Sequence, residues 1–103
     1  MTDNIRNAVI ESVDVSIEHG ALTCMVNLNF GDFRQGFGGF PLHPVGIAGD
    51  RGGWFLYNLL DVVGVLRLAD LPGKAVRARA NPSGGIAALG HIFHDEWFSG
   101  REP

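Results

Sequence analysis

The sequence predicts an α+β fold in which an antiparallel sheet of two β-hairpins and a short glycine-rich strand packs on one main α-helix. Apolar and polar residues alternate in two pairs of adjoining segments, which is the period of a half-buried strand. Only residues 54–63 repeat their apolar residues with the period of a helix. The chain of 103 residues is expected to form a single domain, 1–103, because two separate units would each be too small for a core.

The first hairpin is predicted around a tight turn at His19-Gly20. Residues 9–17 alternate before this turn, and Leu22 to Phe30 alternate after it. The alternating apolar residues of the first segment are Val13, Val15 and Ile17. Both strands present a nearly continuous apolar face, so a helix is the expected cover. Cys24 lies in the second alternation, where we expect a small buried hydrophobe rather than a nucleophile.

A glycine-bearing third strand and the helix are predicted next. Four glycines lie between Gly31 and Gly39, and the strand is expected to continue through Phe40. A surface loop from Pro41 to Gly53 then leads to the helix. The helical stripe comprises Phe55, Leu56, Leu59, Leu60 and Val63. Gly64 suits the left-handed position that follows a helix end.

The second hairpin is predicted around the turn 81–85, after a helical turn over Leu66 to Leu71. Its first strand spans Val76 to Ala80, and its second spans Ile86 to Phe93. The tail that follows is expected to dock on the surface of the domain. Its docking residues would be Trp97 and Phe98.

Composition narrows the class of protein. The net charge is −3, from eleven acidic and eight basic side chains, so we expect no direct binding to duplex nucleic acid. Apolar runs stay far below the roughly 18 residues that a membrane helix needs, and no membrane partner is expected. The polar N-terminal segment shows no signal peptide, which predicts a cytoplasmic protein.

Two patterns resemble catalytic or ligand motifs but lack essential parts. His91, His94, Asp95 and Glu96 are four potential metal ligands. On a strand, however, the two histidines would point to opposite faces, so no metal and no cofactor is expected. The segment Gln35–Phe40 lacks the Lys and the Ser or Thr of a phosphate loop. It is better interpreted as a bulged strand that packs glycines under aromatic rings.

Arginine and aromatic residues dominate binding hot spots, and they gather beside these glycines. The predicted binding residues are Phe33, Arg34, Gln35, Phe37, Phe40, Arg77 and Arg79. Arg77 and Arg79 share the polar face of one strand, where they would meet an acidic partner, a phosphate, or only neighbouring carboxylates. No serine lies in a nucleophile elbow or in a recognisable triad, so we expect no enzyme.

The sequence resembles a group of small proteins encoded by tailed bacteriophages and prophages, which share a Gln-Gly-Phe-Gly-Gly motif. Three blocks carry the resemblance: residues 22–40, residues 62–65 with 71–74, and residues 90–93 with Asp95, Trp97 and Phe98. The resemblance implies no specific activity. It implies a phage accessory protein that works in the cytoplasm of the infected bacterial host.

These observations lead to the hypothesis of a non-enzymatic protein that binds and modulates or inhibits a host protein complex. A defence system is one such target, by analogy with anti-CRISPR inhibitors. The alternative is a sponge for a small anionic ligand such as a nucleotide, and a metal-dependent hydrolase is the third hypothesis. The sponge site would consist of Gly36, Gly38, Gly39, Arg77 and Arg79. Because exposed strand edges can pair with a second copy of the chain, the sequence leaves open whether the protein is a monomer or a homodimer.

Overall fold

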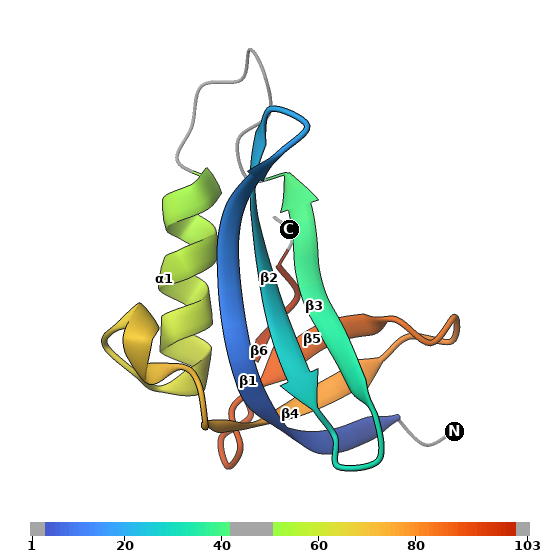
Figure 1. Ribbon diagram of the computed structural model, residues 1–103. Helices are drawn as coiled ribbons and strands as arrows, with labels where there is room; N and C mark the ends of the chain where they lie inside the picture. The colour runs from blue at the N-terminus through green and yellow to red at the C-terminus, as the bar shows by residue number, and fades with distance from the viewer. Residues whose placement is uncertain (1–3, 42–50, 101–103) are drawn as a thin grey trace.

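The computed structural model describes residues 4–41 and 51–100, with the backbone alone at residues 40, 41 and 51. It forms one six-stranded antiparallel sheet with one α-helix, which confirms the α+β class (Figure 1). The strands are β1 (Ile5–Glu18), β2 (Ala21–Asn29), β3 (Arg34–Pro41), β4 (Ala75–Ala80), β5 (Ile86–Gly90) and β6 (Trp97–Phe98). The helices are α1 (Arg51–Val63) and the single 3₁₀ turn η1 (Leu68–Asp70). Residues 42–50 of the predicted loop lie outside the described part.

The strand order is β3-β2-β1-β4-β5-β6, so the long strand β1 lies at the centre. Residues 9–18 of β1 pair with β2, whereas residues 5–9 pair with β4. Figure 1 shows β4 and β5 running across the direction of β1, β2 and β3. Because β3 also contacts β5, the sheet curls into a partly open barrel.

A β-bulge in β1 changes which residues face the core, from even-numbered residues before the bulge to odd-numbered residues after it. The register with β2 shifts between Ile10 and Ser12, which leaves Glu11 as the extra residue. Ala8 and Ile10 are buried before the bulge, and Val13 packs against the core after it. Because of the bulge, Glu11 and Ser12 both face the outer, polar side of the sheet, where Glu11 accepts hydrogen bonds from Asn29 and Arg34.

Helix α1 packs on the inner face of the barrel against β5 and β6. Phe55, Leu59 and Val62 are buried, and Leu56, Leu60 and Val63 pack against the core, so the predicted stripe is confirmed and Val62 is added to it. Gly64 has a φ of 89° and donates to the Leu60 carbonyl at 2.8 Å, as the helix-stop prediction requires. No helix in the described residues is long and apolar enough to cross a bilayer.

The core joins β1, β2 and β3 to the C-terminal strand. Phe98 is buried and lies edge-on to Phe37, Phe55 and Trp54, at centroid distances of 6.1, 5.0 and 5.6 Å. Cys24 is fully buried, as predicted. The expected docking of the tail is therefore deeper than surface contact, because Phe98 is a core residue.

The structure corrects two predictions about strands. Val15 and Ile17, predicted to lie under a helix, are 42% and 76% exposed, because α1 packs against β5 and β6 instead of the end of β1. Strand β5 ends at Gly90 rather than at Phe93. There the chain turns, and the His91 amide donates to the Glu96 carbonyl at 3.0 Å.

Candidate functional site

A groove opens at one mouth of the barrel, where the start of β1 meets the β2–β3 and β4–β5 connections. Its volume is about 260 Å³. The lining residues are Asn4, Arg6, Phe30, Phe33, Gln35, Ala78, Ala80, Gly84 and Ile86. Small and apolar side chains from β4 and β5 supply part of this lining, while aromatic and polar side chains supply the rest. We call this depression the mouth groove.

Two stacked phenylalanines and an arginine form one wall of the mouth groove. The rings of Phe30 and Phe33 lie 4.7 Å apart between centroids and are inclined by 8°. The guanidinium of Arg6 lies 5.5 Å and 5.1 Å from these two centroids. We call these three residues the Arg6–Phe30–Phe33 stack. Cation–π attraction and ring stacking both hold it together.

A tight turn brings the two rings together. The Phe30 amide donates to the Phe33 carbonyl at 2.9 Å, and Gly31 between them has a φ of 96°, which favours glycine. The Gly31 amide also donates to the side-chain oxygen of Asn29 at 2.8 Å. The turn thus fixes the spacing that ring stacking requires.

Asp32 holds the arginine from the other side. The Arg6 guanidinium donates to a carboxylate oxygen of Asp32 at 3.0 Å. This hydrogen bond is the largest of the effects that lower the pKa of Asp32 below its ordinary value, so the carboxylate stays charged at neutral pH. Arg6 is therefore oriented by both the rings and the carboxylate.

Gln35 connects the opposite sides of the mouth groove. Its amide nitrogen donates to the Gly84 carbonyl at 2.7 Å, which ties β3 to the β4–β5 turn. That turn is closed by Asn81, whose amide donates to the Gly85 carbonyl at 2.8 Å and whose side chain accepts from the Gly85 amide at 3.0 Å. Hydrogen bonds within the chain therefore brace the rim of the mouth groove.

Arg34 lies on the outer face of the sheet rather than in the mouth groove. Its Nε donates to Glu11 at 2.7 Å, although the side chain is otherwise well exposed. Arg34 and Gln35 both line a second depression of about 340 Å³. Its residues are Glu11, Ser12, Asn27, Arg34, Gln35 and Gly36. Of the three predicted binding residues at this end of β3, Phe33 and Gln35 line the mouth groove and Arg34 does not.

Phe37, a further aromatic residue of the prediction, does not join this surface. Phe37 is 1% exposed and packs against Phe55 with centroids 6.4 Å apart, so it belongs to the core and cannot contact a partner. The side chain of Phe40 lies outside the described residues. Strand alternation gives the physical reason, because Phe37 faces the interior when Arg34 and Gly36 face outward.

Gly36 and Gly39 of β3 lie under a methionine, whereas Gly38 lies beside an aromatic ring, that of Phe55. A Cβ built on Gly36 would lie 2.5 Å from the Met25 sulfur, and one on Gly39 would lie 2.8 Å from the Met25 methyl carbon. Gly38 has a φ of 106°, and a Cβ there would collide with the Cys24 carbonyl oxygen. The contacts of all three glycines are therefore structural.

Arg77 and Arg79 lie beneath the ring of Trp97, at 4.9 Å and 4.2 Å from its centroid. Arg77 also donates to the carbonyls of His91 and His94, at 2.8 Å and 2.7 Å. These bonds hold the 91–96 turn, so Arg77 serves the fold. Arg79 Nε is buried without a hydrogen-bond partner among the described residues.

The histidines are closer together than a strand would place them. Because β5 ends at Gly90, the rings of His91 and His94 lie 4.3 Å apart, which corrects the prediction that they point to opposite faces. Nδ1 of His91 accepts from the amides of Phe93 and His94, both at 3.0 Å. Within residues 4–41 and 51–100, no three His, Cys, Asp or Glu side chains are grouped as metal ligands.

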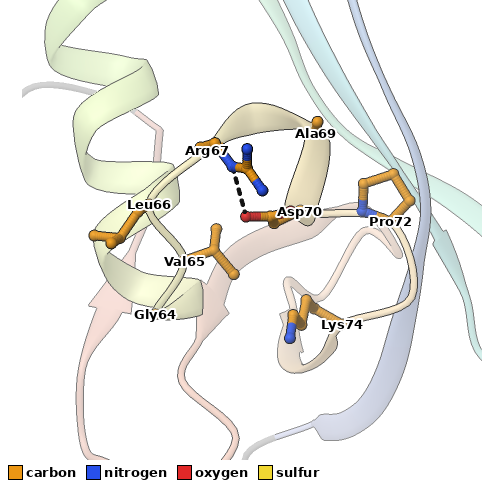
Figure 2. Close-up of a pocket in the computed structure, with 8 residues that line it drawn as sticks. All are labelled: Gly64, Val65, Leu66, Arg67, Ala69, Asp70, Pro72 and Lys74. Atoms are coloured by element: carbon orange, nitrogen blue, oxygen red, sulfur yellow. Dashed lines mark hydrogen bonds and ion pairs between the residues drawn. The ribbon is translucent and has the colours of Figure 1, made fainter.

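A wider, open depression of about 770 Å³ lies where the chain leaves α1 for β4. Figure 2 shows the Arg67 guanidinium directed to Asp70, a contact of 3.3 Å, while Leu66 points away from the depression. The charge of Arg67 is thus paired within this connection. The mouth groove, with its stacked rings, is the better candidate for binding.

Sequence reasoning found Phe33 and Gln35 but missed Arg6 and Phe30. The Phe-Gly-Asp-Phe spacing of residues 30–33 is the signal that could have indicated two rings across a turn. Arg6 had no such signal, because only the β1–β2 and β1–β4 pairings bring it to these rings. Comparison of the chain with protein-family models, with curated proteins and with solved structures gives no match.

Proposed function

We propose that the chain is a protein-binding module that modulates or inhibits a protein complex of a bacterial host, and that the mouth groove is its contact surface. The observation that supports this proposal is the Arg6–Phe30–Phe33 stack, in which Arg6 and Phe33 are exposed, beside an apolar floor. Arginine and aromatic residues that surround a small pocket are the usual composition of a binding hot spot. The braced rim supports the proposal further, because little conformational freedom would be lost on binding.

The bacterial host and its cytoplasm are part of this proposal because the sequence resembles phage proteins. A defence complex, inhibited in the manner of an anti-CRISPR protein, is the specific form that we propose. The occupant of the groove would be an apolar or planar side chain of the partner, because Phe33 presents a ring and the floor includes Ala78 and Ile86.

Electrostatics favours a protein partner over a nucleic acid. Some partly open β-barrels, the OB-folds, bind oligonucleotides on the face of strands 2 and 3. Here the outer face of β1, β2 and β3 carries the carboxylates of Glu11, Asp14 and Glu18. Its cation, Arg34, is paired with Glu11. A phosphate backbone would meet net negative charge on this face.

The anionic-ligand hypothesis has less support. Gly36 and Gly39 lie under Met25 and Gly38 lies against Cys24, whereas Arg77 and Arg79 of β4 lie under Trp97. The two halves of that site therefore have separate structural partners. Native mass spectrometry of protein purified from bacterial cells tests this alternative, since a sponge would retain a small anion.

The test of the proposal is affinity purification of the tagged protein from lysate of the bacterial host. We expect wild type to recover a specific complex, and Phe33→Ala to lose it through at least a tenfold loss of affinity. Tyr57→Ala is the matched control, because Tyr57 is an exposed aromatic residue on α1 outside the mouth groove. Recovery of the same complex by a folded Phe33→Ala variant would contradict the mouth groove as the contact surface.

A further inference from the structure

The second half of β1 has an open edge. From Ser12 to Glu18 this strand pairs with β2 on one side. On its other side, β4 pairs with residues 5–9 alone, and Ile10 exchanges two further backbone bonds with Gly73 and Lys74. In the described part of the chain nothing pairs with this side beyond Ile10. A strand edge of this kind offers free amide and carbonyl groups to another strand.

The side chains at this edge are exposed on both faces of the sheet. All five residues from Asp14 to Glu18 are exposed. Val15 and Ile17 lie on the inner, apolar face, opposite Cys24 and Leu22 of β2, at 42% and 76% exposure. An added strand could therefore bury apolar side chains on this face while it extends the ladder.

The outer face of the same edge is acidic. Asp14 accepts from the Asn27 side chain at 2.9 Å, and Glu18 accepts from the Thr23 hydroxyl at 3.4 Å. Neither carboxylate has an ion-pair partner among the residues that the structure describes. A strand beside β1 would place alternate side chains next to these two charges, and cations suit that position.

We propose that the open edge of β1, from Ser12 to Glu18, accepts an extended lysine- or arginine-bearing segment of a partner protein as an additional strand. The segment would alternate apolar residues, which cover Val15 and Ile17, with basic residues beside Asp14 and Glu18. The surface is separate from the mouth groove, because Arg6 and Phe30 lie at the other end of the β1–β2 pair.

Charge also argues against a second copy of the chain at this edge. An antiparallel pairing of two copies centred on Val15 would place Asp14 diagonally next to Asp14 and Glu18 of the other copy. Like charges at such positions destabilise a sheet. A basic partner segment avoids this repulsion and gains attraction instead.

Binding of synthetic peptides to the purified full chain tests the proposal. The probe is a fluorescent seven-residue peptide of alternating Lys and Val, measured by anisotropy at low and high salt. We expect saturable binding that weakens with salt. Two control peptides should not bind: one has Glu in place of Lys, and the other has N-methylated backbone amides that cannot pair. Equal binding of the N-methylated peptide would overturn strand addition.

Variants locate the surface. We expect the double change Asp14→Asn and Glu18→Gln to weaken binding about tenfold at low salt, which is the range for two exposed charge pairs. Ile17→Lys should abolish binding, whereas Leu66→Lys, at an exposed apolar residue elsewhere, should leave it unchanged. If the two lysine variants bind alike, the edge is not the site. Changes in NMR amide chemical shifts on peptide addition that do not involve residues 12–18 would also show that the edge is not the site.

Two further outcomes separate this proposal from its alternatives. Phe33→Ala should bind the peptide as wild type does, so failure of the mouth-groove proposal would leave this one standing. Sedimentation should show a monomer in the absence of peptide. A dimer that Ile17→Lys dissociates would overturn the proposal and assign the edge to a second copy.

Discussion

The thiol of Cys24 is the residue whose chemistry the fold changes most clearly. Burial, followed by the negative charge of Asp14, raises its pKa to about 11. The nucleophilic form of cysteine is the thiolate, so the raised pKa and the burial both make this side chain inert at neutral pH. The prediction of a small core hydrophobe in place of a nucleophile agrees with this environment.

We therefore expect Cys24 to resist iodoacetamide at pH 7 in the native protein and to react after unfolding in denaturant, as read by mass spectrometry. The raised pKa also implies a pH dependence of stability. Above about pH 9 the unfolded thiol loses its proton before the folded one does, so the free energy of unfolding should fall as the pH rises toward 11. Rapid alkylation of the folded protein would contradict this account.

At the scale of single elements, β3 shows why its glycines are required. A side chain at Gly38 meets two obstacles, a φ of 106° and the backbone carbonyl of Cys24. Gly73 has a similar φ of 89° but no atom within 4 Å of its Cβ position. The two positions therefore separate backbone strain from steric collision.

We expect Gly73→Ala to lower the free energy of unfolding by about 1 kcal/mol through backbone strain alone. Gly38→Ala should cost about 3 kcal/mol or more, because β2 and β3 must also move apart. Urea denaturation of both variants measures the difference. Equal losses of unfolding free energy in the two variants would mean that β3 can move away from Cys24 at little cost. Close strand packing would then not explain the glycine at position 38.

The mouth groove shows which of its residues can be predicted from β3 alone, without knowledge of the elements that pack against this strand. Phe33 and Gln35 were predicted because arginine, aromatic and amide side chains gather along β3. Phe37 was placed with them wrongly, because it shares the inner face of β3 with Gln35 but lies deeper in the barrel, away from the mouth groove. Its burial follows from contacts with Phe55 and Phe98, which come from distant parts of the chain.

At the scale of the whole molecule, the C-terminal strand completes the core. Phe98 contacts a residue of β3 and two residues of α1, so the last described strand joins the helix to the first half of the sheet. A substitution at Phe98 should therefore destabilise the strands and the helix together. Phe93, five residues earlier, is exposed and offers a matched comparison.

Phe98→Ala should lower the free energy of unfolding by about 3–5 kcal/mol, the usual cost of removing a large buried ring. Phe93→Ala should change it by less than about 0.5 kcal/mol. Urea unfolding monitored by tryptophan fluorescence and by circular dichroism tests both values. If the two signals remain coincident in the variants, the barrel and the helix unfold as one unit; a small loss for Phe98→Ala would refute its role.

By itself, the sequence determined the α+β class, the helical stripe around Phe55 and Leu59, the helix stop at Gly64 and the burial of Cys24. These features depend on residue periodicity and on backbone preference, which are local. Tertiary structure alone decided the curl of the sheet, the meeting of Arg6 with Phe30 and Phe33, and the open edge at Val15 and Ile17. Each of these depends on which distant strands pair and where the pairing ends, and alternation within one strand carries no information about its neighbours.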